Sequence, residues 1–274
     1  MVLDYLLSPH QARKDPWSLA IAAMLFVSFG VIIDVLMPSV HGSIIIFAML
    51  PAIPLLWMLM VREEVEEEKD NLLGHAGYYH KHGFLGSIKP HGSLWEILAF
   101  FFLGAVIAYT FWYAALPAET SQQMFADQIN EVKLIQGAMA TAATGNMFTE
   151  GKFWFLFEHN LQVLGIMFVF CLLYGIGSVY MLMWNASIIG VVLGGKIATE
   201  GIPGVVVGFL GLLPHGIFEI SAYFVATIAG GIFSVSLMRG VTKPGFRYVL
   251  YDVLFWTGLS LALLAIGAAI EASY

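Results

Sequence analysis

The stretch WSLAIAAMLFVSFGVIIDVLM, residues 17–37, decides the fold class of this chain. Asp34 is its only charged side chain. An apolar run of about 20 residues is long enough to cross the hydrocarbon core of a bilayer as a helix. Because a helix satisfies its own backbone hydrogen bonds, which lipid cannot do, this run is expected to be a transmembrane helix.

The composition extends this expectation to the whole chain. Of the 274 residues, 59% are hydrophobic and only 11% are charged, and the mean hydropathy is +0.82. Ordinary soluble domains carry about 25% charged residues. The formal net charge of −7 also lacks the basic excess of a nucleic-acid binder. These values exclude a soluble enzyme, a disordered chain and a nucleic-acid partner, and they predict an integral membrane protein.

Apolar segments separated by polar loops predict an all-α, polytopic bundle of about seven transmembrane helices. The fifth segment is interrupted by glycines and by Pro203, so we expect a discontinuous span there. A re-entrant hairpin in the same segment would give six spans instead. The expected spans are residues 16–37, 43–61, 94–116, 161–184, 186–213, 214–238 and 248–270.

We expect the chain to divide into two regions. Residues 1–151 hold three spans, a cytoplasmic loop rich in acidic residues and histidines (62–93), and an amphipathic segment on the outer side (122–143). Residues 152–274 form a membrane core that ends in a final span. Cys171 is the one cysteine, so it cannot form an internal disulfide, and we interpret it as a packing residue.

The distribution of basic residues predicts the orientation. With the N-terminus in the cytoplasm, nine of the 12 Lys and Arg residues fall in the inner loops, and the outer loop holds only Lys133 and Lys152. Loops on the cytoplasmic side are the ones that carry excess Lys and Arg. We therefore predict a multi-pass protein of the cell membrane with a cytoplasmic N-terminus and an outer C-terminus.

The most informative polar stretch is LLPHGIFE, residues 212–219. Its His215 and Glu219 are four residues apart, which places them on one helix face about one turn apart. With Pro214 opening the sixth span, both would enter the membrane at the outer level where Asn160, preceded by His159, opens the fourth span. We expect Asn160, His215 and Glu219 to converge there. The group is interpreted as a metal or proton-relay site, or alternatively as a buried His–Glu hydrogen bond that fixes helix register.

Two weaker candidates lie between these elements. Lys196 and Glu200 are again four apart, in the interrupted segment, and discontinuous spans often line transport sites. The pair is equally interpretable as solvated charge in a loop. Asn185 ends the expected fourth span and serves there either as a ligand or as a helix cap.

The C-terminal half holds a series of polar and glycine elements in a fixed order: His159-Asn160, Gly175, Gly177, Asn185, Gly190, the run Leu213-Pro214-His215-Gly216, Glu219 and Gly230-Gly231. In these elements, residues 153–238 resemble the stage II sporulation protein M family of prokaryotic membrane proteins. The resemblance implies a membrane core module and points to Asn160, Asn185, His215 and Glu219. It also implies similarity to a sporulation component that scaffolds partners in the cell envelope.

Three functions are consistent with these features. The first is a scaffold or anchor for envelope proteins, with the lipid bilayer and a second copy of the chain as further partners. The second is a transporter of an ion, metal or small solute through Asn160, His215 and Glu219. The third is an intramembrane hydrolase with a divalent metal, the one cofactor that the His–carboxylate pair admits. Because GxSxG, HExxH and Walker motifs are absent from the sequence, the first two are favoured over an enzyme.

Overall fold

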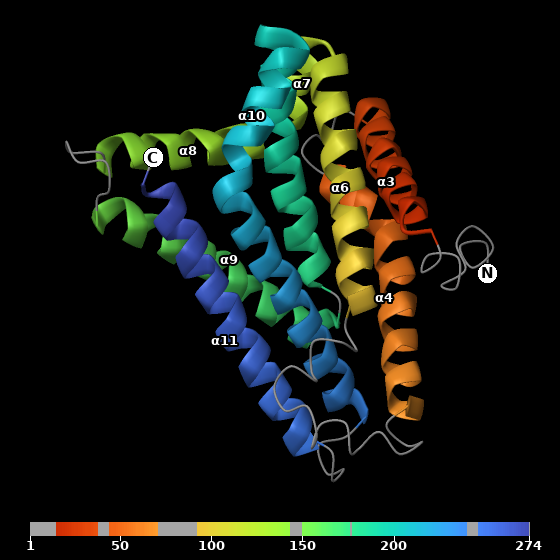
Figure 1. Ribbon diagram of the computed structural model, residues 1–274. Coiled ribbons are helices and arrows are strands. Elements are labelled where there is room, and N and C mark those ends of the chain that lie inside the picture. The colour runs from red at the N-terminus through yellow and green to blue at the C-terminus, as the bar shows by residue number, and fades with distance from the viewer. Residues whose placement is uncertain are drawn as a thin grey trace.

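The computed structural model confirms an all-α fold, without strands in the residues that it describes (Figure 1). These are residues 15–37, 44–70, 92–142, 150–175, 177–239 and 246–273. The helices are α3 (Trp17–Leu36), α4 (Ile44–Asp70), α6 (Gly92–Ala115), α7 (Ala118–Met124), α8 (Ala126–Ala142), α9 (Glu150–Tyr174), α10 (Ser178–Arg239) and α11 (Phe246–Glu271).

Five of the described helices are long and apolar enough to cross a membrane, namely α3, α6, α9, α10 and α11. The apolar part of α4, Ile44–Leu59, is shorter. The helices α3, α4 and α6 lie where the first three spans were predicted, and α4 continues through the acidic run to Asp70. The chain is therefore an integral membrane protein built as a helix bundle.

The predicted fourth span, residues 161–184, is wrong because the chain turns in its middle. Helix α9 ends at Tyr174, and Gly175 follows with a φ of +68°. This left-handed conformation is readily adopted by glycine alone, so the helix ends here. Residues 178–184 then belong to the start of α10, which runs in a new direction (Figure 1).

Helix α10 is a hairpin of two arms, residues 178–200 and 202–239. Gly201 separates them with φ 69° and ψ −158°, a conformation outside the helical region. Beyond it, Gly204 faces the backbone of Lys196, and Gly208 faces the side chains of Lys196 and Leu193. The arms are therefore antiparallel. The break predicted within residues 186–213 is present, but it reverses the chain where a single interrupted span was expected.

The second arm begins earlier than the sequence suggested. Pro203 lies in its first turn, where the missing N–H costs no hydrogen bond. Pro214, which we expected to open a span, instead lies inside the helix. As a result His215 and Glu219 are well inside the second arm and not at its entrance. The same correction applies to Asn160, which lies ten residues after Glu150, the first residue of α9.

The helices α3, α4, α6 and α10 are nearly upright in Figure 1, whereas α8 lies roughly at right angles to them. Helices α4 and α10 end, and α11 begins, at one end of the bundle, and the α10 turn, α7, α8 and the C-terminus lie toward the other (Figure 1). The amphipathic segment expected at residues 122–143 corresponds to the end of α7 and to α8. The loop residues His75, His80, His82, His91 and Lys243 lie outside the described residues.

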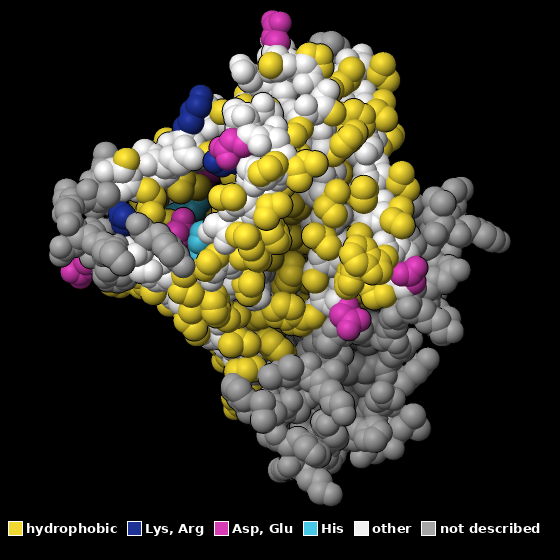
Figure 2. All heavy atoms as spheres, turned by 45° about the horizontal axis from the view of Figure 1, so that its top comes forward, with side chains coloured by type: hydrophobic (Ala, Val, Ile, Leu, Met, Phe, Trp, Pro, Cys, Tyr) yellow, Lys and Arg dark blue, Asp and Glu magenta, His cyan; other side chains and the backbone are white. Residues whose placement is uncertain are grey.

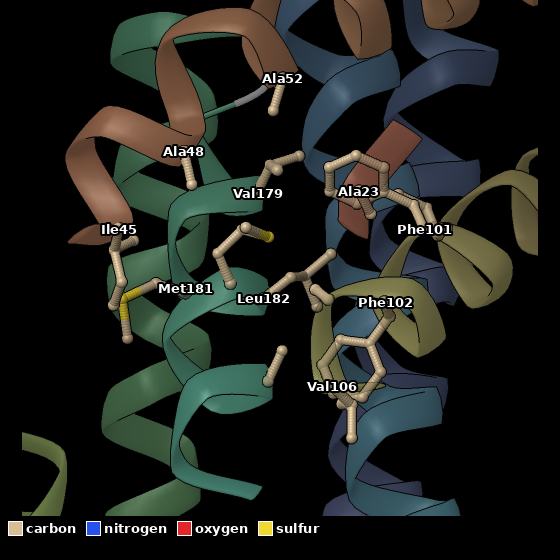
Figure 3. Close-up of a cluster of buried hydrophobic side chains, with 14 of the residues drawn as sticks. Ala23, Ile45, Ala48, Ala52, Phe101, Phe102, Val106, Val179, Met181 and Leu182 are labelled. Carbon is tan, nitrogen blue, oxygen red and sulfur yellow. The ribbon is translucent and has the colours of Figure 1, made fainter. Parts of the chain in front are cut away.

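The main core joins α3, α4 and α6 to the first arm of α10. Figure 3 shows Met181 and Leu182 of this arm between Ile45 of α4 and Val106 of α6. All four of these side chains are at least 92% buried, with Ile45 at 2% exposure and Val106 at 8%. This apolar packing holds α10 in place, so that its second arm can present polar side chains to α9 and α11.

Substitution of Gly201 tests the α10 turn. We expect Gly201→Ala to lower the free energy of unfolding by about 1–3 kcal/mol, because only glycine adopts this backbone conformation without strain. The matched control is Gly211→Ala, in the second arm, where a Cβ meets no atom within 4 Å. Thermal unfolding in detergent micelles measures both. Equal unfolding temperatures for the two variants would contradict the assigned turn.

Candidate functional site

Asn160 lies on the buried stripe of α9. Residues at intervals of three or four share one face of a helix. Asn160, at 7% exposure, follows this interval together with its apolar neighbours, so the helix turns its amide toward the bundle interior. The other buried residues of the stripe are Lys152, Leu156, Leu164, Met167 and Cys171.

The amide of Asn160 joins two side chains of the second α10 arm. Its Nδ2 donates a hydrogen bond of 2.7 Å to Oε1 of Glu219, and its Oδ1 accepts one of 2.9 Å from the hydroxyl of Tyr223. Glu219 and Tyr223 are four residues apart, so one amide reaches both. The result is a polar network between α9 and α10 in which each of the three side chains has a partner.

Helix α11 forms the third wall of the site. Ser260 donates a hydrogen bond of 2.7 Å to the backbone oxygen of Ala222, which fixes α11 against the second arm. A Cβ on Gly267 would lie 2.8 Å from Cγ of Glu219, so α11 passes directly beside that side chain. One turn later, Glu271 interacts electrostatically with Glu219. Two carboxyl groups from different helices therefore lie close enough for their charges to interact.

His215 lies one turn before Glu219 on the same arm, and its side chain is half-buried. Its Nδ1 atom is fully buried and has no hydrogen-bond partner among the described residues. A buried polar atom without a partner costs free energy, so such atoms are rare in folded proteins. The Nδ1 atom of His215 is therefore available to form a hydrogen bond or to bind a proton.

The site is not sealed. Figure 2 shows a hollow beside α8 in which histidine and acidic side chains are visible. The side chains of His215, Glu219 and Glu271 are each of intermediate exposure, whereas Tyr223 and Asn160 are buried. Asn160 and Tyr223 are therefore inside the bundle, and the side chains of His215, Glu219 and Glu271 are partly exposed at its edge.

His159 is held by α8 and does not join the network. Its Nε2 lies 3.5 Å from Oε1 of Glu131, and its ring stacks on Phe155 at a centroid distance of 6.3 Å. Because Glu131 belongs to α8, this contact ties α8 to α9 one residue before Asn160. His159 thus lies at the edge of the site, not within it.

The remaining predicted contributors lie elsewhere. Lys196 and Glu200 form an exposed ion pair of 2.6 Å at the α10 turn. Lys196 is level with Gly204 and Gly208, so Glu219 is roughly 20 Å further along the second arm at 1.5 Å per residue. Asn185 donates its Nδ2 to the backbone oxygen of Met181, 2.8 Å away on its own helix. None of the three is part of the network.

A resident metal has no complete ligand set in the part of the chain that the structure describes. No group of three or more His, Cys, Asp or Glu side chains there could hold an ion. Catalytic zinc usually has three protein ligands. The arrangement therefore gives no support to the metal-dependent hydrolase considered from the sequence, and it is not taken further.

Two members of the site, Tyr223 and Glu271, were not predicted. Tyr223 continues the four-residue spacing of His215 and Glu219, which was a usable signal. Glu271 lies three residues after the buried Ala268 and seven after the buried Leu264, on the inner face of α11. An acidic residue at that interval at the end of an apolar span was also a usable signal.

The region that holds this site matches a known family. Residues 97–274 match the family described as stage II sporulation protein M. The chain belongs to this family. The resemblance noted for residues 153–238 is confirmed, and the match to the stage II sporulation protein M family extends it to α6 and α11.

One further relative is an archaeal protein. The chain is 30% identical over 120 residues to the uncharacterized protein MJ0793 of Methanocaldococcus jannaschii. The alignment covers 42% of this chain and 66% of the relative, just under two thirds of its length. No solved structure matches the chain.

The network makes a prediction about stability. Asn160→Ala removes the partner of both Glu219 and Tyr223, and leaving a buried polar group unpaired costs about 1–3 kcal/mol. Tyr223→Phe removes one of the same two bonds, so the double variant should lose less than the sum of the single losses. Thermal or denaturant unfolding in detergent measures the four proteins.

The control for this cycle is Asn185→Ala, because Asn185 bonds only within its own helix. We expect its unfolding free energy to fall by less than that of Asn160→Ala. Strict additivity of Asn160→Ala and Tyr223→Phe would contradict the network.

Proposed function

We propose that this membrane protein binds a cation at Glu219 and moves it across the bilayer. One observation carries the proposal: Glu219 lies between three helices, hydrogen-bonded to Asn160, and interacts with a second carboxyl group, Glu271. The site therefore holds two carboxyl groups inside a helix bundle, where an ionised carboxylate is costly unless a positive charge lies close to it.

The cost of such an arrangement supports a functional interpretation. Ionisable side chains within spanning helices are expensive, and those that persist mark ion pathways, proton relays or ligand sites. A purely structural contact between α9 and α10 would need only neutral partners, such as the Asn160–Tyr223 pair. The carboxyl groups add a cost that packing alone does not explain, and a bound cation offsets it.

Cation movement through Glu219 is directly measurable. We expect purified protein in liposomes to dissipate an imposed cation gradient, and Glu219→Gln to abolish this activity because it removes the charge but keeps an acceptor for Asn160. Indicators for H⁺, Na⁺, K⁺ and Mg²⁺ inside the liposomes provide the measurement. Glu200→Gln, at the distant α10 turn, is the matched control and should retain the activity. Transport by Glu219→Gln at the rate of the unaltered protein would refute the proposal.

We also propose that the protein anchors partners in the cell envelope. Helix α8 lies across the upright helices and exposes 68% of Leu134 among polar neighbours (Figure 1). A large apolar side chain on a crosswise helix is suited to contact with another protein. Membership of the stage II sporulation protein M family is consistent with this role, because the resemblance to that family implied an envelope scaffold. This function does not require Glu219, so the two proposals are separable.

Partner binding can be tested at Leu134. We expect Leu134→Ser to reduce the proteins that co-purify in mild detergent, because it removes apolar contact area from α8. Glu219→Gln should leave them unchanged. Ile266→Ser on α11 is the control, since Ile266 is also exposed, at 44%. Quantitative mass spectrometry compares the variants, and equal partner recovery for Leu134→Ser and the unaltered protein counts against the anchoring function.

The cytoplasmic N-terminus stays a prediction within this proposal, as does the division of the chain at residue 151. Support for the orientation comes from the ends of α4 and α10 and the start of α11, which lie at one end of the bundle (Figure 1). The sequence places Arg62, Lys69, Arg239 and Arg247 at or near those helix ends. A common side for these segments is what the positive-inside rule requires.

A further inference from the structure

The hydrogen bonds around Glu219 limit which cation the site can take. The Tyr223 hydroxyl occupies the oxygen of the Asn160 amide, so the amide turns its N–H toward Glu219. A metal cation requires oxygen atoms directed at it, and here the nearest amide directs a donor. Asn160 therefore stabilises the carboxyl group of Glu219 without supplying a ligand to a metal ion.

The remaining donors are too few for a metal cation that has lost its waters. Calcium takes six to eight oxygen ligands, and magnesium binds to one or two carboxylates only where several of its waters also fit. The site offers the carboxyl groups of Glu219 and Glu271 and the imidazole of His215. In the described ranges these do not form a group able to hold a metal ion. A cation that needs only one or two donor atoms fits this set.

Each helix that packs against Glu219 contributes at least one titratable side chain to its surroundings. On α10 they are His215 and Tyr223, and on α11 the group is Glu271. On α9 they are His159, which Glu131 of α8 holds at the edge of the site, and the buried Lys152, two turns before Asn160 on the same face. Two neighbouring carboxyl groups can share one proton, because this removes the repulsion between like charges.

The buried Nδ1 of His215 provides the next position for that proton. It has no hydrogen-bond partner among the described residues, and His215 is one turn from Glu219 on the same arm of α10. A neutral imidazole nitrogen can bind a proton and release it again. Transfer breaks the O–H bond of a carboxylic acid and forms an N–H bond, which leaves a carboxylate and an imidazolium.

We infer that the cation carried by this site is the proton, shared between Glu219 and Glu271 and passed through His215. This inference rests on the proposed cation function and names its cargo. Gly267 allows α11 to pass close to Glu219, since a Cβ there would meet Cγ of that side chain. The approach of Glu271 to Glu219 therefore depends on the absence of a side chain at residue 267.

The experiment uses liposomes that contain the full chain and a pH-sensitive dye, with equal salts on both sides and an imposed pH gradient. We expect the unaltered protein to collapse the gradient, and Glu219→Gln, Glu271→Gln and His215→Gln to lose this activity. Gly267→Ala should reduce it because the new methyl group displaces Glu219. Gly258→Ala on the same helix, where a Cβ meets nothing within 4 Å, should keep it.

The outcomes separate the inference from the proposed function. Movement of Na⁺, K⁺ or Mg²⁺ that requires Glu219, without collapse of the pH gradient, would overturn the proton inference and leave the cation function standing. No movement of any cation would overturn both. Infrared spectra give a second measurement that needs no transport. We expect a band of a protonated carboxyl group that Glu219→Gln or Glu271→Gln removes, and its absence in the unaltered protein would also overturn the inference.

Discussion

The hydrogen bond between Asn160 and Glu219 is the contact on which the polar interior of this protein depends. A carboxyl group inside a helix bundle needs a donor, and lipid provides none. The amide of α9 supplies that donor, and the Tyr223 hydroxyl fixes the amide in the required orientation. The packing of α9 against the second arm of α10 is therefore specified by polar groups, whereas the main core is specified by apolar shape.

The α10 hairpin makes this contact geometrically available. Its first arm is held by α6, where Gly190 lies against Tyr109 and Gly194 against Tyr113. Its second arm packs Phe224 edge-on against Trp95 and Phe102 of α6 and turns His215, Glu219 and Tyr223 toward α9 and α11. The turn at Gly201 connects an arm that serves mainly packing to an arm that carries the polar groups.

The sequence predicted the parts of the fold that depend on length and hydropathy. Helices α3, α4 and α6 were placed closely because polar segments separate them. The region from α9 to α10 was placed poorly, because Gly175 ends a helix inside apolar sequence that hydropathy treats as continuous, and because the break at Gly201 reverses the chain. A positive φ at a glycine depends on the three-dimensional path of the chain, and the pattern of residue types does not reveal which of many glycines adopts it. Choosing Pro214 over Pro203 as the start of a span followed from the same difficulty.

The candidate site was more predictable than the helices that hold it. Asn160 and Glu219 do meet, although the spans drawn around them were shifted, because in each helix the side-chain spacing selects the inner face wherever the helix begins. The spacing of Glu271 on α11 was a signal in the sequence, but its place beside Glu219 depends on the packing of α11 through Gly267 and Ser260. All members of the network fall within residues 97–274, the part that matches the stage II sporulation protein M family. Helices α3 and α4 precede that region and pack on the side of α6 and the first arm of α10. Their contribution is therefore to the apolar packing, and the polar network lies in α9, the second arm of α10 and α11.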